Sequence, residues 1–581
     1  MKKLVSLAVI LALCASLFSC GDHSQPQTDA STTKSVSETQ TTETTSQTET
    51  VSADTQKTET TAETTETAEE TTVTATSETT EKPLSPTERG YVLYSDFGAK
   101  GDGTKDDFLP IFAAHAYANE NGLPVKADNG ATYLIGAQSV GREITVKTDT
   151  DWTGATFIID DTIVEVNDKK TYTKPIFRIV SSEESRKITN ITSLKKSATN
   201  IGFQTDQPCL AVIRDNKDRI FIRSGIHAAA GDLKQEIVLL DENGNIDPST
   251  PLTFDYPSVN SIMLYPIDTE TLTVRGGEFH TIVNKAPAKH TYFHRNIIVE
   301  RSNVVLENIT HTVEGETDAG GAPYHGFAYV THATNVTVKD CVFTPHYIFS
   351  EIKSDGAATF GYDIHINMAT NVRVVGCTQT IDINDTNYWG VFTSNFARNL
   401  TLEDCVLSRF DAHRGVYNAT IKNCVFGHQG ILFVGFGTFT IEDTTVRASS
   451  FVQLREDYGA TFDGKLVIRN CRFEPQTKLN SKSELIKARN NCEHNYGYRA
   501  HFPTLEIDGL FIDDTNATSG YKNIYILPTF TETAGRFDIQ SSRGYAVPET
   551  VTLRNITTAS GRPYQYCRVS HLFANTTIIE E

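Results

Sequence analysis

The chain has 581 residues, 39% of them hydrophobic, and a formal net charge of −20 at pH 7. This acidic balance argues against a nucleic-acid partner, for which a basic surface is expected. It argues more weakly against a polyanionic substrate, because local basic patches can override the net charge. Residues 87 to 581 are many for one hydrophobic core, whereas repeated units that pack only on their neighbours avoid this limit.

The first residues are typical of an export signal. Lys2 and Lys3 precede an apolar run over 4–18, which is too short to span a membrane. The run ends in LFSC, which resembles the lipobox of bacterial lipoproteins and implies cleavage before Cys20 and acylation of its thiol. We therefore expect a signal peptide over 1–19, lipidation at Cys20, and a lipid-anchored protein on the extracellular face of the bacterial cell membrane. An ordinary secretory signal with a chance cysteine is the alternative.

From residue 20 to residue 86 the chain is dominated by Thr, Ser and Glu. Such a segment cannot bury enough apolar surface to offset the entropy cost of ordering, and its glutamates repel one another. We expect a disordered tether here and a folded domain over 87–581. The membrane would then be contacted only through the lipid anchor.

A glycine-rich string opens the folded domain. YSDFGAKGDGTKDD (Tyr94–Asp107) precedes a helix-like stretch over 109–119 and the strand-like ATYLIG over 131–136. This order resembles the opening of the pectate-lyase-like β-helix superfamily, which includes polygalacturonase-like enzymes and phage tailspikes. The resemblance implies an all-β, right-handed, single-stranded parallel β-helix with an N-terminal capping helix. It implies a polysaccharide partner but no particular activity, because hydrolases, lyases, epimerases and binding proteins share this fold.

We expect the Asp and Gly cluster of this opening to form a structural cap, and no metal site is predicted. Between residues 181 and 287 the sequence has strand and hairpin signals, such as QEIVLLDENGNIDPST with its DENGN turn. Two interpretations stay open for this range, a β-rich insertion and irregular early coils.

One string then recurs with irregular spacing. Its copies read NVTVKDCVF, NVRVVGCTQ, NLTLEDCVL, NATIKNCVF and KLVIRNCRF. The period-two alternation predicts a short strand, and the Asn before it and the Asp or Asn after it suit turns in the left-handed conformation. Repeated short strands joined by loops of variable length are typical of a parallel β-helix, because the loops leave the stack and the strands do not.

The cysteines of these repeats share one register. We expect them to form an internal ladder of small packed thiols, with equivalent residues about 4.8 Å apart in neighbouring coils. Parallel Cβ vectors are poorly placed for disulfides, and no CxxC motif or histidine cluster predicts a metal site. The ladder contains Cys341, Cys377, Cys405, Cys424 and Cys471, with Thr444 in the same register.

Counting back from the ladder cysteines places two Asp-x-His strings at nearly the same position in their coils. They run from Asp363 to His365 and from Asp411 to His413, and the first needs a one-residue shift to align with the second. Because Asp and His on one strand face would be costly in an apolar interior, we expect that face to carry the site. The candidate catalytic residues are Asp382, Asp385, Asp411 and His413. The candidate substrate-binding residues are Asp363, His365, Tyr388, Trp389, Arg414, His428, Arg455 and Asp457.

These residues allow three functions. Glycoside hydrolysis, the favoured one, needs two carboxyl groups, which Asp382 or Asp385 together with Asp411 would supply, with His413 or His428 tuning the acid. The NTD, GHG and RIK strings of polygalacturonases are not reproduced, and solvated loop acids or a structural Asp411–His413 pair are equally good interpretations. The oligomeric state stays open.

The two other functions use the same face differently. A polysaccharide lyase would use Arg414 with His413 at a uronate, with Arg455 binding the carboxylate in a bidentate manner and Ca²⁺ as a possible cofactor. Apart from that Ca²⁺, no cofactor is expected. A non-catalytic glycan binder or adhesin would use the loops and aromatic side chains without turnover.

Overall fold

The computed structural model describes most of the folded domain. The described residues are 84–164, 174–225, 231–285, 293–317, 324–348, 361–490, 493–530 and 545–581. The predicted signal peptide, the lipidation site Cys20 and the predicted tether up to residue 83 lie outside them. Within the described ranges, no helix is both long and apolar enough to cross a membrane.

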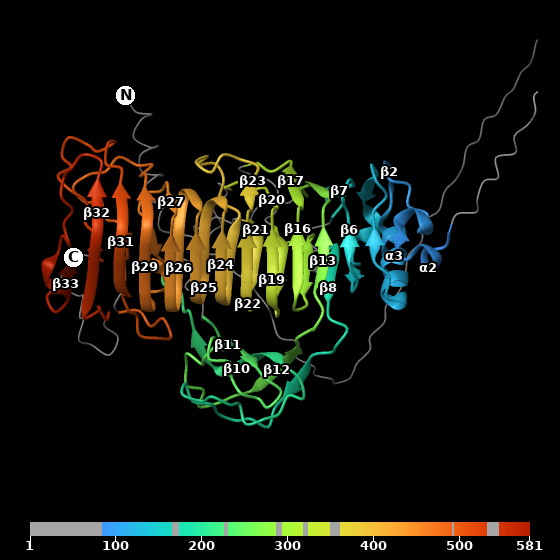
Figure 1. Ribbon diagram of the computed structural model, residues 1–581, viewed down its shortest axis with the longest axis horizontal. Helices are drawn as coiled ribbons and strands as arrows, with labels where there is room; N and C mark the ends of the chain where they lie inside the picture. The colour runs from blue at the N-terminus through green and yellow to red at the C-terminus, as the bar shows by residue number, and fades with distance from the viewer. Residues whose placement is uncertain are drawn as a thin grey trace, which may run out of the picture. The chain divides into compact units, whose positions relative to one another are not determined.

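In the described part of the chain, the coils form one right-handed parallel β-helix of 29 strands (Figure 1). A representative coil consists of β15 (Ile297–Glu300), β16 (Val304–Glu307) and β17 (Thr310–Glu314). The next consists of β18 (His325–Thr331), β19 (Thr334–Lys339) and β20 (Val342–Phe343), and each strand pairs in parallel with its counterpart. The predicted fold class is confirmed.

Equivalent strands stack into three sheets. Sheet 1 contains β2 (Asp102–Asp106), β4 (Thr132–Ile135), β7 (Thr156–Asp160), β14 (Glu278–Ile282), β17, β20, β23 (Thr378–Gln379) and β27 (Thr445–Val446). Sheet 2 contains β5 (Ile144–Val146), β8 (Phe177–Val180), β15, β18, β21 (Tyr362–Asn367), β28 (Val452–Leu454) and β30 (Ile486–Lys487). Sheet 3 contains β1 (Val92–Leu93), β3 (Val125–Lys126), β6 (Thr150–Asp151), β13 (Leu272–Arg275), β16, β19, β22 (Thr370–Val375) and β33 (Thr577–Glu580).

Six longer strands bend from one sheet into the next. They are β24 (Phe392–Glu403), β25 (Val406–Lys422), β26 (Val425–Glu442), β29 (Phe462–Phe473), β31 (Thr504–Ile512) and β32 (Thr550–Thr558). The first three supply strands to sheet 2 between β21 and β28.

The coil interior is apolar and stacked. Inward side chains lie over their counterparts in the next coil, as the rings of Phe392 and Phe410 do with centroids 5.1 Å apart. The cysteines of the predicted ladder are buried and free, which confirms the packing interpretation. Thr444 continues the series, because its hydroxyl accepts a hydrogen bond from the amide of Cys424 at 3.3 Å.

The turn asparagines form a second ladder on the outside of the corner before sheet 3. Asn371 has a φ of 51° and donates its side-chain amide to Asn335 at 3.2 Å. Asn399 donates in turn to Asn371 at 3.1 Å, and Asn418 to Asn399 at 3.1 Å. The left-handed turns expected from the sequence are therefore reinforced by amide-to-amide hydrogen bonds between coils.

We expect Asn371→Ala to destabilise the fold by about 2 kcal/mol, because it removes three side-chain hydrogen bonds and places a Cβ without a polar side chain in the left-handed region. Asn371→Gly relieves the backbone strain and should cost about half as much. Urea unfolding of both variants measures the difference, and equal losses would contradict the strain argument.

Two helices lie at the N-terminal end of the stack (Figure 1). They are α2 (Pro86–Arg89) and α3 (Phe108–Asn121), and α3 covers the end of the coils. The acids of the preceding string bind backbone amides, since Asp107 accepts from Lys100 at 2.8 Å and from Gly101 at 2.9 Å. These carboxylates therefore act within the turn.

A separate antiparallel sheet interrupts the stack between sheet 2 and sheet 3. It leaves after β8, returns at β13, and has the strand order β11 (Asp232–Leu240), β10 (Cys209–Ile220), β12 (Ser261–Pro266), β9 (Arg186–Ile188). We call it the inserted sheet. It has its own apolar core and lies beside the coils (Figure 1). Since β13 and β14 already belong to coils, it occupies only part of 181–287.

Candidate functional site

The outward face of sheet 2 combines polar residues from successive coils. Ile364, Phe392 and Phe410 point into the core, so the residues that alternate with them point outward. Long connections from sheet 1 enter this sheet at one edge, and the inserted sheet adjoins its other edge. The outward positions of successive strands, which we call the outer row, are Tyr329, His365, Thr393, Asp411, Leu432, Gln453 and Lys487.

The pairing of the strands in sheet 2 differs from the alignment expected for the two Asp-x-His strings. Ile366 pairs with Ser394, and Ser394 pairs with Ala412. His365 therefore lies in the register of Asp411, whereas Asp363 lies one outward position earlier. The two strings are not equivalent, because counting from the cysteines ignores the differing lengths of the turns between them.

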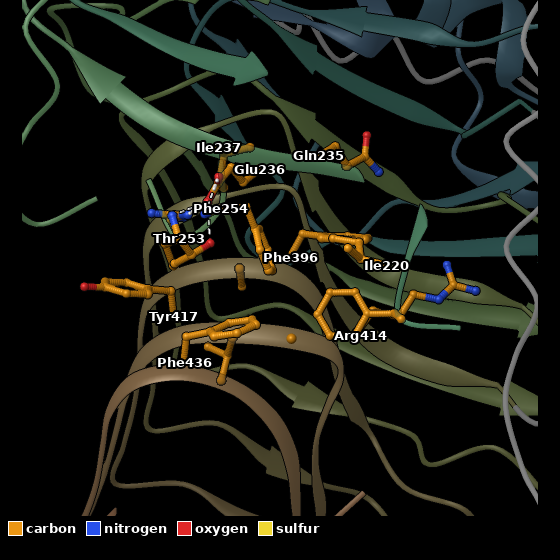
Figure 2. A pocket seen from close by; sticks show the side chains of 15 residues that line it. Ile220, Gln235, Glu236, Ile237, Thr253, Phe254, Phe396, Arg414, Tyr417 and Phe436 are labelled. Atoms are coloured by element: carbon orange, nitrogen blue, oxygen red, sulfur yellow. Dashed lines mark hydrogen bonds and ion pairs between the residues drawn. The ribbon is translucent and has the colours of Figure 1, made fainter. Parts of the chain in front are cut away.

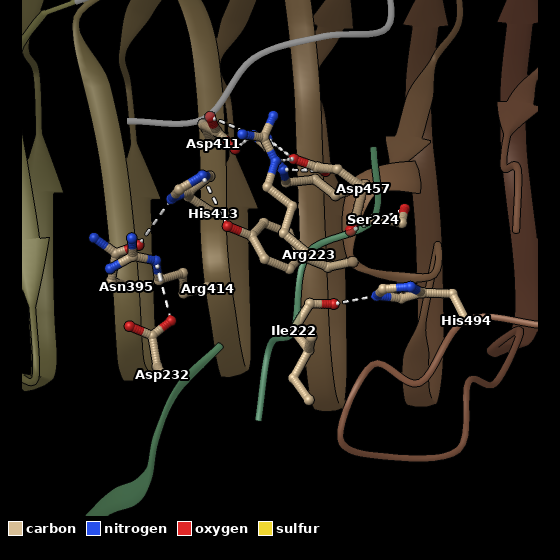
Figure 3. Close-up of polar contacts among 12 residues, drawn as sticks. Ile222, Arg223, Ser224, Asp232, Asn395, Asp411, His413, Arg414, Asp457 and His494 are labelled. Atoms are coloured by element: carbon tan, nitrogen blue, oxygen red, sulfur yellow. Dashed lines mark hydrogen bonds and ion pairs between the residues drawn. The ribbon is translucent and has the colours of Figure 1, made fainter. Parts of the chain in front are cut away.

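Asp411 lies at the centre of a buried ionic network (Figure 3). Nη1 of Arg455 donates to both carboxylate oxygens at 2.8 Å, Nη2 of Arg409 donates at 2.8 Å, and the hydroxyl of Tyr362 donates at 2.9 Å. Burial opposes the charged form, but Arg409 and Arg455 hold the pKa of Asp411 well below its usual value. Asp411 is therefore a permanent, fully bonded anion, which is unsuited to donating a proton.

The same arginine joins the network to the inserted sheet. Nη2 of Arg455 donates to Asp457 at 2.7 Å, and Nε of Arg223 donates to the same carboxylate at 3.0 Å. Arg223 belongs to the segment that follows β10, and Figure 3 shows this segment crossing the strands. The amide of Ser224 donates to the carbonyl of Asp457 at 2.8 Å, so backbone and side chain hold the segment together.

His413 belongs to a hydrogen-bonded row that crosses coils. Its Nδ1 lies 3.2 Å from Oδ1 of Asn395, whose amide lies 2.9 Å from Nε2 of His365. Nδ1 of His365 lies 3.0 Å from Nδ1 of His325. Burial, with Arg455 nearby, lowers the pKa of His413 well below its usual value, so this imidazole is neutral. The row connects residues of four coils through one face.

Asp363 lies in a second buried cluster at the corner between sheets 1 and 2. It accepts from Nδ1 of His311 at 2.7 Å, from Nε2 of His346 at 3.0 Å and from the amide of Thr344 at 2.9 Å. His346 also contacts Glu316 at 2.6 Å. Burial opposes its charged form, but Glu316 and Asp363 raise the pKa of His346 to about 10. Asp363 is thus neutralised within the protein.

The predicted loop acids have a local role in the structure. Asp382 accepts from the amide of Asn384 at 2.9 Å, and Asp385 accepts from the amide of Asn387 at 2.9 Å. Each carboxylate thereby closes a turn two residues ahead. The structure shows no contact that brings either acid to Asp411.

The aromatic and histidine residues of this loop lie at the edge of sheet 2. The ring of Tyr388 packs against Tyr347 at 5.2 Å, and both are half-buried. The ring of Trp389 lies 3.9 Å from the guanidinium of Arg409, next to the Asp411 network. Nδ1 of His428 donates to the carbonyl of Ile383 at 3.1 Å, so His428 holds the loop.

Arg414 lies at the seam with the inserted sheet, where its Nε is 3.3 Å from Asp232. A crevice opens here, lined by aromatic side chains from both parts, including Phe254 and Phe436 (Figure 2). Its volume of about 30 Å³ holds one or two waters and is too small for a sugar. A buried ion pair of Arg398 and Glu236 closes its base. The interface between the coils and the inserted sheet is therefore closely packed.

The structure also adds residues that were not among the candidate site residues. Arg223, Arg409, Tyr362, His311 and His346 complete the buried networks described above. On the outer row, Gln453 pairs with Lys487, and Glu456 follows the same strand. Glu456 lies between the candidate residues Arg455 and Asp457. In the described part of the chain, no group of three or more His, Cys, Asp or Glu side chains is placed to hold a metal ion.

No protein-family model matches the chain, and no curated protein matches it. The tailspike gp61 of Pseudomonas phage phi297 is similar with a TM-score of 0.50 and 13% identity, over 84% of both chains. The tailspike gp54 of Acinetobacter baumannii bacteriophage AP22 has a TM-score of 0.47 and 12% identity, over 84% of this chain and 79% of that one. PfbA, a surface adhesin of Streptococcus pneumoniae, has a TM-score of 0.39 and 12% identity, over 75% and 90%. The first likeness supports the right-handed parallel β-helix fold.

Proposed function

We propose that this protein binds a polysaccharide at the cell surface, along the outward face of sheet 2. The observation that carries the proposal is the outer row, which has polar side chains at every position except Leu432. A chain of sugars needs such repeated polar contacts, spaced along one direction.

The position of the protein outside the cell is part of the same proposal. The apolar run and Cys20 would attach the chain to the membrane through lipid, and the Thr, Ser and Glu segment would hold the β-helix away from it. This arrangement suits a protein that meets large glycans outside the cell.

Glycoside hydrolysis is a second candidate, favoured by Glu456. Its side chain is 17% exposed beside the outer row, and burial raises its pKa although Lys487 and Arg489 oppose the shift. A carboxyl group with a raised pKa is what the general acid of this reaction requires. Asp411 does not fit that role, because its oxygens are occupied, and we assign it as a positioning residue.

The experiment is binding and turnover of the purified protein on a panel of plant, algal and host glycans, with and without chelator. New reducing ends without the absorbance of unsaturated uronates support hydrolysis, and that absorbance supports a lyase. Binding without products supports a binder. Absence of binding to every glycan would refute the proposal.

Tyr388 provides a specific check on the binding face. We expect Tyr388→Ala to weaken glycan binding by about tenfold, because an aromatic ring supplies large contact area at low entropy cost. The matched control is Tyr117→Ala, since Tyr117 is also half-buried and packs against an aromatic ring but lies on α3, at the N-terminal end of the stack. Isothermal titration of both variants measures the effect, and equal losses would show that the ring has no specific role.

A further inference from the structure

The C-terminal part of the outer row is more accessible than its centre. Leu432 pairs with Gln453, and Gln453 pairs with Lys487, so the three side chains follow one another across β26, β28 and β30. Each is half-buried, whereas His365, Thr393 and Asp411 are buried. A ligand on this face therefore meets Gln453 and Lys487 directly.

Lys487 and Gln453 keep their hydrogen-bonding groups available. Neither side chain makes a hydrogen bond or an ion pair with another described residue, in contrast to the arginines of the Asp411 network. Burial lowers the pKa of the Lys487 ammonium, while Glu456 opposes that shift. A partly desolvated cation without a bonded partner is a strong attractor for an anion.

Two further groups complete this part of the face. Arg489 is 55% exposed, and its Nε lies 3.9 Å from Oε2 of Glu456, outside hydrogen-bond distance. The carboxylate of Glu484, also near Lys487, is bound by the amide and hydroxyl of Thr529. Lys487 and Arg489 thus lie near Glu456, whose carboxylate, unlike that of Glu484, accepts no hydrogen bond from another described residue.

We propose that Lys487, Gln453 and Arg489 bind the carboxylate of an acidic sugar, such as a uronate. The proposal rests on the polysaccharide-binding function above and names the class of glycan. An ammonium, an amide and a guanidinium are all donors, and together they complement both oxygens of a carboxylate. The acids Asp363, Asp411 and Asp457 are neutralised by histidines and arginines, so they do not repel an anionic glycan from this end of the row.

The test uses the full-length protein and three immobilised acidic polysaccharides, polygalacturonate, alginate and hyaluronan, each beside its carboxyl-reduced neutral form. We expect at least one acidic form to bind and its reduced form to bind at least tenfold more weakly. Lys487→Gln should raise the Kd by about tenfold or more, the loss typical of a charged hydrogen bond. Lys482→Gln is the matched control, because it removes the same charge from an exposed position off the row.

Glu456 supplies an independent readout. Burial raises its pKa, with Lys487, Arg489 and Arg455 opposing and Asp457 reinforcing the shift. As the pH falls through that raised pKa, Glu456 loses its charge and affinity for the acidic glycan should increase. Glu456→Gln should remove this pH dependence.

Two results would overturn the inference while leaving the proposed function intact. They are binding of neutral glycans alone, and equal binding of acidic and carboxyl-reduced forms. Binding that Lys487→Gln leaves unchanged would overturn the assignment of this site. Failure to bind any acidic or neutral glycan would count against both proposals.

Discussion

Replacing Arg455 by Met is expected to lower the free energy of unfolding by about 3–5 kcal/mol, the loss typical of breaking a buried ion pair from one side. Arg455 is 4% exposed and donates hydrogen bonds to both Asp411 and Asp457. Without it, Arg409, Tyr362 and Arg223 are the remaining side-chain partners of the two buried carboxylates among the described residues. Urea unfolding followed by circular dichroism measures the loss.

The control for Arg455→Met is Arg472→Met. Arg472 is 44% exposed and pairs with Glu474, so its removal should cost less than about 1 kcal/mol. Adding Asp411→Asn to Arg455→Met should recover part of the lost stability, because it removes one of the stranded charges. A cost for Arg455→Met within the range of the control would show that the network does not stabilise the fold.

Acid is expected to destabilise the N-terminal end of the stack well before the carboxylates titrate. Burial lowers the pKa of His115, on α3, to about 3, from an unfolded value near 6.5. Below pH 6.5 the unfolded chain binds a proton that the native chain excludes, so stability falls as the pH drops from 6.5 towards 3. The slope is about 1.4 kcal/mol per pH unit.

The check is the pH dependence of unfolding free energy for the parent and for His115→Gln. His115 contacts the hydroxyl of Tyr94 at 2.9 Å, so the variant will be less stable at neutral pH. Between pH 6.5 and 4, the unfolding free energy of the variant should nevertheless fall less steeply than that of the parent. The difference in slope should correspond to about one bound proton. The exposed His571 provides the control, and His571→Gln should keep the parent slope. An unchanged slope in His115→Gln would refute the assignment.

The fold was predictable because a β-helix imposes its geometry on every coil. Stacking forces the alternating strand residues, the turn asparagines such as Asn371 and the internal cysteines into one register, and the sequence repeats that register. The inserted sheet has no such signature. Its strands pair in antiparallel fashion around a separate core, so the sequence between 181 and 287 showed strands but not their arrangement.

The outward direction of the Asp411 side chain was predictable, but its contacts were not. Asp411 was expected to be a catalytic acid because Asp and His alternate around it. Its role depends instead on Arg455, which comes from a later coil, and on Arg409 two residues away. Sequence alternation shows which way a side chain points, but it does not show which cations lie against it.

Lys487 could not be identified as a candidate from the sequence. It ends a strand of two residues, β30, that carries none of the repeat's Asn or Cys markers. Its place in the outer row follows only from its pairing with Gln453. Such a residue is found from the register of the sheet and from the absence of a bonded partner within the described chain.

The free thiols of the cysteine ladder allow the transient opening of individual coils to be measured by alkylation. The thiols of Cys341, Cys377, Cys405, Cys424 and Cys471 are all buried and free. Each one marks a different coil and reacts with an alkylating agent only while that coil is open. The five labelling rates would therefore rank the coils by how often they separate, and show whether the stack frays from its ends or opens at its centre.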